Sequence, residues 1–94
     1  MVTFFAKHTV KDYSNWKQVY DGLAAIRQNM GVTGASVSRD PQNANLLTVT
    51  HQFNDLSSAT AFAHSDDLKT AMGKAGVEGK PELWIAEQIE QTAF

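Results

Sequence analysis

Apolar residues recur along the first third of the chain with two different periods. From Val2 to His8 they alternate with the other residues, so that Val2, Phe4 and Ala6 share one side, which predicts a strand. After Asp12 the spacing changes to three and four, which predicts a helix with one apolar stripe. Asp12 is a predicted N-cap, and Gly31 occupies the position of a left-handed glycine that ends a helix. The stripe comprises Tyr13, Trp16, Val19, Tyr20, Leu23, Ile26 and Met30.

The rest of the chain repeats this alternation of strand and helix signals. Residues 32–40 and 46–53 predict two strands, and the turn formers of residues 40–45 predict a hairpin between them. Asp55 can cap a second helix, which breaks and restarts near residues 65–67. The glycines from Gly73 to Gly79, closed by Pro81, predict a loop, and residues 82–91 predict a last strand. The second helix carries Leu56, Ala59, Phe62, Ala63, Leu68, Ala71 and Met72 on its apolar positions.

The order strand, helix, strand, strand, helix, strand predicts a single α+β domain over residues 1–94. We expect a ferredoxin-like βαββαβ fold, a four-stranded antiparallel sheet with helices on one face and right-handed crossovers. In this arrangement we expect the first and third strands to be a parallel central pair. Side-chain alternation along the strands places both apolar and polar residues on the face of the sheet that the helices do not cover. That face is too apolar to be exposed to water and too polar for an ordinary core, so we expect a second copy of the chain to cover it. The residues of that face are Phe5, Thr48, Thr50, Gln52, Trp84 and Gln88.

Composition narrows the function classes. The chain has no cysteine, which excludes disulfides and a Cys-based zinc site. Its 8 basic and 10 acidic residues are scattered, which argues against a nucleic-acid surface. No secretory signal and no apolar run long enough to span a bilayer is visible, so we expect a soluble, cytoplasmic protein that binds neither nucleic acid nor membrane.

Twelve short segments carry a resemblance to a known family: residues 10–13, 16–17, 20, 31, 53–56, 61–62, 65, 68, 71–72, 75–77, 79 and 81–84. In these segments the chain resembles small bacterial proteins of the dimeric α/β-barrel superfamily, near the antibiotic-biosynthesis-monooxygenase-like group. The resemblance covers nearly the whole chain and concerns the fold more than the activity. It implies a homodimer with the two sheets face to face and a pocket between sheet and helices in each subunit. The superfamily includes cofactor-free monooxygenases, haem-degrading enzymes, isomerases, cyclases and non-catalytic members, and a shared fold does not transfer chemistry.

Site patterns of two branches can be tested against this chain. Haem-degrading members use an asparagine on the first strand, a tryptophan on the third and a histidine on the second helix, and only His64 matches. Monooxygenases of polyketides use Asn, Trp and Tyr to steady a carbanion-like substrate. Trp16, Tyr20 and Trp84 offer such side chains here without aligning to that pattern.

Three residues are the candidate catalytic groups: His51, His8 and Tyr20. If the first and third strands run parallel, parity places His8 and His51 on the helix-facing side, next to each other at one mouth of the pocket. An imidazole there could act as base, acid or substrate-orienting group, whereas an ordinary strand-end histidine would make one hydrogen bond and no more. The Tyr20 hydroxyl needs a polar partner if it is buried. The histidine spacing does not indicate a metal site, and we expect no cofactor.

The candidate ligand-binding residues are Trp16, Phe53, Phe62 and His64. A helical stripe such as the one that contains Trp16 is more often plain core than the lining of a pocket. We therefore expect a homodimer that binds and transforms a compact hydrophobic metabolite, as a cofactor-independent monooxygenase, isomerase or cyclase. The alternative is a non-catalytic ligand-binding or structural dimer. A cavity of a few hundred Å³ beside His51 would favour the first function, and a pocket plugged by Trp16, Phe53 and Phe62 the second.

Overall fold

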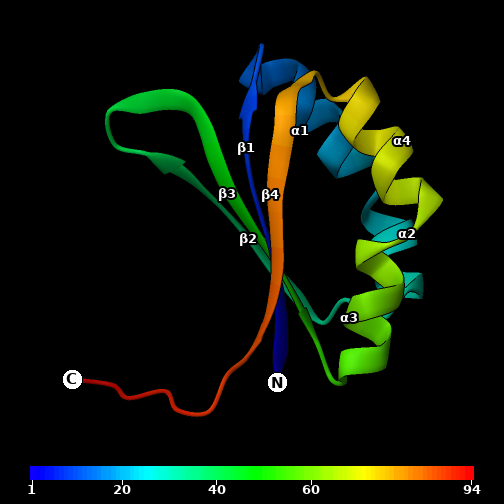
Figure 1. The fold of residues 1–94 in the computed structure, drawn as a ribbon, viewed down its shortest axis with the longest axis vertical. Coiled ribbons are helices and arrows are strands. Elements are labelled where there is room, and N and C mark those ends of the chain that lie inside the picture. Colours follow the sequence, from blue (N-terminus) through cyan, green and yellow to red (C-terminus); the bar gives the residue numbers. More distant parts are fainter.

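The computed structural model describes residues 1–94 as one four-stranded sheet with all helices on one face (Figure 1). The strands lie in the order β2-β3-β1-β4, and every neighbouring pair is antiparallel. The predicted βαββαβ order is confirmed, with each predicted helix divided into two short ones. None of the helices has the length and apolar run needed to cross a membrane. The elements are β1 (Val2–Val10), α1 (Tyr13–Gly22), α2 (Ala24–Asn29), β2 (Gly34–Asp40), β3 (Asn43–Phe53), α3 (Leu56–Ala63), α4 (Asp66–Lys74) and β4 (Val77–Glu87).

The central pair β1 and β3 is antiparallel, so the prediction of a parallel central pair was wrong. The register places Phe4 opposite His51 and His8 opposite Leu47. The physical reason is the connectivity. The crossover through α1 and α2 makes β2 parallel to β1, and the tight β2–β3 hairpin then reverses the chain. β3 therefore runs against the β1 strand beside which it lies.

Local capping chemistry sets the helix ends. Asp12 accepts the backbone N–H of Ser14 at 3.0 Å and begins α1, and Asp55 accepts that of Ser58 at 2.7 Å and begins α3. The predicted long helix is interrupted at Leu23, directly after Gly22, and resumes as α2. Gly31 follows with a φ of +97°, a left-handed conformation that confirms its predicted role.

The last strand begins earlier than predicted. Residues 73–81 were expected to be a loop, but β4 starts at Val77 and passes through Gly79 and Pro81. Both residues lie where the β1–β4 register shifts, and Gly79 has a φ of +67°. Because β4 is an edge strand, a bulge containing glycine and proline interrupts few ladder hydrogen bonds.

The same strand also ends earlier than predicted, at Glu87 rather than Gln91. Val2 is the first residue of β1 and pairs with Glu87. The Gln88 N–H donates to the Met1 carbonyl at 2.9 Å, which extends the pairing of the two strands by one residue. The end of β4 thus lies beside the start of β1.

The core lies between the sheet and the helices. β1 alternates buried and less buried residues along its whole length, and β3 does so from Leu47 to Phe53. The only buried polar side chains are His8 and His51. The opposite face carries no helix, and there Phe5 stacks on Trp84 with ring centroids 5.1 Å apart and planes 5° apart. The buried apolar side chains are Val2, Phe4, Ala6, Val10, Trp16, Leu47, Val49, Phe53, Ala59, Phe62, Ala71 and Ala75.

Candidate active site

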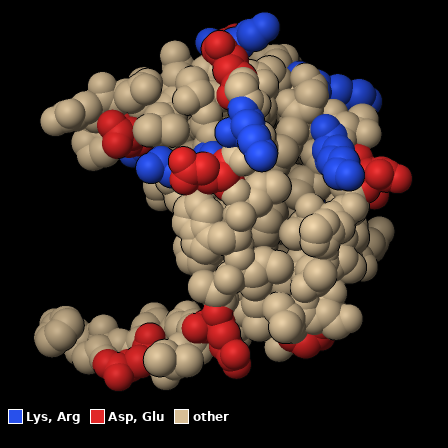
Figure 2. Space-filling model, in the orientation of Figure 1, with Lys and Arg blue, Asp and Glu red and all other residues tan.

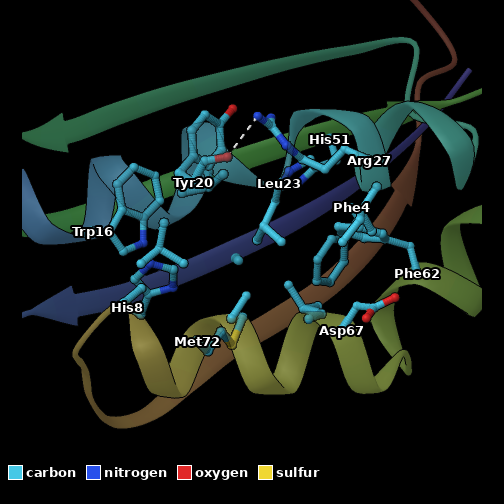
Figure 3. Close-up of a pocket in the computed structure, with 17 residues that line it drawn as sticks. Phe4, His8, Trp16, Tyr20, Leu23, Arg27, His51, Phe62, Asp67 and Met72 are labelled. Atoms are coloured by element: carbon cyan, nitrogen blue, oxygen red, sulfur yellow. Dashed lines mark hydrogen bonds between the residues drawn. The ribbon is translucent and has the colours of Figure 1, made fainter.

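A cavity lies between the inner face of the sheet and the two helix pairs (Figure 3). α1 and α2 form one wall, α4 forms the other with the end of α3, and β1 and β3 form the floor. Its volume is about 60 Å³. That exceeds the roughly 10–15 Å³ needed by one water molecule, but it is below the few hundred Å³ expected of a roomy ligand pocket. The lining residues are Phe4, Ala6, His8, Trp16, Val19, Tyr20, Leu23, Ile26, Arg27, Val49, His51, Phe62, Asp67, Leu68, Ala71, Met72 and Ala75.

Both candidate histidines line this cavity, as their strand parity predicted. The exposed fraction is 6% for His8 and 4% for His51, and none of the four ring nitrogens has a hydrogen-bond partner. They do not lie side by side, however. Because β1 and β3 are antiparallel, His51 is opposite Phe4, four residues along the sheet from His8, which corresponds to roughly 13 Å. The structure thus places the two imidazoles in one cavity at different levels, and the predicted pair at one mouth was wrong.

His51 is enclosed by aromatic rings. Its centroid lies 4.9 Å from that of Phe62, 6.2 Å from that of Phe4 and 6.3 Å from that of Tyr20. Burial, with a smaller contribution from the Arg27 cation, lowers the pKa of His51 from 6.5 to about 4. The imidazole is therefore neutral at pH 7, with one nitrogen able to accept a proton and the other able to donate a hydrogen bond.

His8 occupies the other end of the cavity. Its ring lies 6.0 Å from Trp16, and burial lowers the pKa of His8 as well. Trp16 in turn stacks on Tyr20, with centroids 4.8 Å apart. This aromatic wall connects the two histidines along the first helix pair.

Arg27 is a cavity residue that the sequence reasoning missed. Its guanidinium carbon lies 3.9 Å from the centroid of the Tyr20 ring, and Nη2 donates to the Tyr20 carbonyl at 3.1 Å (Figure 3). Its Nε is buried without a partner. The only ion pair of the chain joins Lys17 and Asp21, so no carboxylate neutralises Arg27. The sequence did contain one signal for this role. Arg27 follows Tyr20 by seven residues, so on a continuous helix the two side chains would lie on the same face, two turns apart.

The remaining predicted ligand contacts divide into two groups. Trp16 and Phe62 line the cavity. Phe53 is fully buried and lies outside the lining, with its ring 5.6 Å from that of Phe62. His64 is the exposed C-cap of α3 and also lies outside the lining, so the structure does not bring it to the cavity. No three His, Cys, Asp or Glu side chains gather in a metal-binding arrangement.

The sequence matches no protein-family model and none of the curated proteins. Solved structures do match. A proposed antibiotic biosynthesis monooxygenase from Bordetella bronchiseptica superposes with a TM-score of 0.79 at 10% identity, covering 95% of this chain and 97% of that one. A second such protein, from Caulobacter crescentus, superposes with a TM-score of 0.75 at 17% identity, covering 95% of this chain and 90% of that one. SnoaB from Streptomyces nogalater, a cofactor-independent oxygenase, gives 0.78 at 14% identity, covering 96% and 94%.

The chain has the fold of these monooxygenases. This result confirms the predicted α+β architecture and the resemblance in fold to the antibiotic biosynthesis monooxygenases. At such identities the likeness establishes the fold alone, and the reaction has to be argued from the site.

Proposed function

We propose that the protein binds a compact, largely apolar metabolite that carries an acidic hydroxyl group, and oxygenates it without a cofactor. One observation carries this proposal: a neutral, unpartnered His51 faces an apolar cavity that also contains the unneutralised cation of Arg27. The fold shared with SnoaB is consistent with the proposal.

In this mechanism His51 accepts the proton of a phenol or enol hydroxyl. An imidazole with a pKa of about 4 is a weak base on its own. Formation of a phenolate beside it raises that pKa, because the imidazolium and the anion then attract each other in a region of low dielectric constant. Arg27 lines the same cavity, and its positive charge favours this anion without direct contact.

The electron-rich phenolate then reacts with O₂. For a simple phenol the balance is C₆H₅OH + O₂ → C₆H₄O₂ + H₂O. One oxygen atom forms a new C=O bond, the O–O bond breaks, and the other oxygen leaves as water with the two hydrogens that the substrate loses. The substrate itself supplies all four electrons. The apolar walls orient the ring and keep solvent away from the reactive anion.

The size of the cavity limits the substrate and supports a second candidate function. About 60 Å³ admits little more than a few ligand atoms unless the two helix pairs separate. We therefore favour a single-ring compound over a polycyclic one. The same narrowness favours, as the alternative, a ligand-binding dimer without turnover.

We also propose that a second copy covers the bare face of the sheet. The four helices α1 to α4 all lie on the other face, and the C-terminal segment runs outward from the end of β4 (Figure 1). In Figure 2 the β2–β3 end and the C-terminal segment project on either side of a recess; the wall between them shows no charged side chains, whereas charged side chains lie along both of its edges. Trp84, stacked on Phe5, is 42% exposed, and Ile89 and Phe94 are fully exposed. A homodimer would bury this apolar surface.

The proposed function is tested by oxygen uptake with resorcinol and 1-naphthol in flavin-free buffer. The wild type should consume one O₂ per quinone formed. His51→Leu should lower the rate about 100-fold, because it removes the base while keeping a similar volume. His64→Leu, which changes an exposed histidine, is the matched control and should retain the rate. A rate unchanged in His51→Leu, or no uptake with any phenol, would overturn the proposed oxygenase.

A further inference from the structure

We propose that Arg27 is the binding group for a carboxylate on the ligand, so that the cavity selects ring compounds that carry a carboxylate in addition to the acidic hydroxyl. This inference rests on the proposed function and names the substrate class of that site. Arginine commonly binds carboxylates through two parallel N–H···O hydrogen bonds.

The Arg27 guanidinium has no anionic partner. It lines a cavity whose walls are mainly hydrophobic, its Nε is buried with no partner, and no acidic side chain lies within ion-pair distance. Its single hydrogen bond, from Nη2 to the Tyr20 carbonyl, and its stacking on the Tyr20 ring fix its orientation. A positioned cation with an unused donor is suited to an anionic ligand.

Arg27 also lies between the inner cavity and a second, more open groove. On its other side lies a groove of about 180 Å³ at the edge of the sheet, with Gln28 and Thr33 among its lining residues. Arg27 is the only residue that lines both hollows. A carboxylate held there would remain partly solvated while the attached ring enters the inner cavity, which avoids the cost of burying a charge completely.

One acidic residue opposes this arrangement. Asp67 lines the cavity from the opposite helix pair, on α4 (Figure 3). It is exposed, so solvent screens its charge, and Asp67→Asn should strengthen the binding of an anion only slightly.

The test compares benzoate with benzamide, which has nearly the same shape but no charge. Dissociation constants are measured by NMR titration, following the Arg27 Nε–H and the His51 ring signals. We expect benzoate to bind the wild type about tenfold more tightly or better, the range of a charge-assisted hydrogen bond. The Arg27 Nε–H signal should shift with benzoate and stay in place with benzamide.

Three variants separate ligand binding from a structural role of Arg27. Arg27→Gln should bring the two affinities within about twofold of each other, and Arg27→Lys should keep part of the preference because the charge remains. Arg39→Gln is the matched control. Arg39 also stacks on a tyrosine, with its guanidinium carbon 4.8 Å from the Tyr13 centroid, but it is exposed and outside the cavity. This variant should keep the full preference.

The possible failures are distinguishable. Equal affinities in the wild type, or a benzoate preference that survives in Arg27→Gln, would overturn the carboxylate inference while leaving phenol oxygenation intact. A benzoate preference that depends on Arg27, together with no oxygen uptake, would support the inference and overturn the oxygenase. If neither probe binds at millimolar concentration, both the ligand cavity and the carboxylate inference are wrong.

Discussion

The buried His51 makes the stability of the fold depend on pH in a way that one substitution should remove. In the unfolded chain its imidazole titrates near 6.5, and in the folded protein the pKa falls to about 4. Between these values the unfolded state binds a proton that the folded state does not bind. Protonation thus favours unfolding, and stability decreases as the pH falls below 6.5.

The magnitude follows from the two pKa values. Between pH 7 and pH 5 the folded protein should lose about 2 kcal/mol, and below pH 4 the full difference of 2.5 pKa units corresponds to about 3 kcal/mol. Burial also lowers the pKa of His8, so this residue adds to the loss in the same direction. The pKa of Asp55 is lowered from 3.8 by its hydrogen bonds to Ser58, so Asp55 contributes to the pH dependence only in more acidic solution.

The assay is urea unfolding at pH 7, 6 and 5, for the wild type, His51→Leu and the exposed-histidine control His64→Leu. His51→Leu should reduce the loss between pH 7 and pH 5 by about 2 kcal/mol, leaving only the part due to His8. It should also be the more stable protein at pH 5, since it replaces an unpartnered buried imidazole with an apolar side chain. A wild type whose stability is flat over this range, or a His51→Leu variant with the wild-type slope, would refute a neutral buried His51.

Three further predictions concern the fold and its assembly. Ser65→Ala should destabilise the protein by about 1 kcal/mol in urea unfolding, because the hydroxyl that caps α4 is lost, whereas Ser57→Ala should be nearly neutral. Gly31→Ala should cost about 1–2 kcal/mol because φ is +97° there, while Gly22→Ala, with open space around it and no positive φ, should raise stability by up to about 1 kcal/mol. Light scattering should give twice the 10.3 kDa chain mass for the wild type and the single mass for Trp84→Lys. A monomeric wild type would contradict the proposed dimer.

Local signals in the sequence were sufficient for the faces of the strands and the starts of the helices. Parity placed His8 and His51 on the inner face because side chains alternate strictly along a strand. Asp12 and Asp55 marked helix starts because an N-cap hydrogen bond is made within a few residues.

Features that depend on a neighbouring strand were not predictable in this way. The relative height of the two histidines follows from strand direction, which the connectivity determines and the local pattern does not. Gly79 and Pro81 read as a loop, yet β1 provides a ladder that accommodates them in a bulge. The role of Arg27 depends on its stacking on Tyr20, a contact across the interruption between α1 and α2.

The proposed function requires the ligand to occupy the cavity beside His51. The most direct measurement is the set of intermolecular nuclear Overhauser effects between bound resorcinol and the protein. We expect contacts from the ligand ring protons to the His51 and Phe62 rings. Contacts only to Phe5 and Trp84, on the opposite face of the sheet, would contradict it.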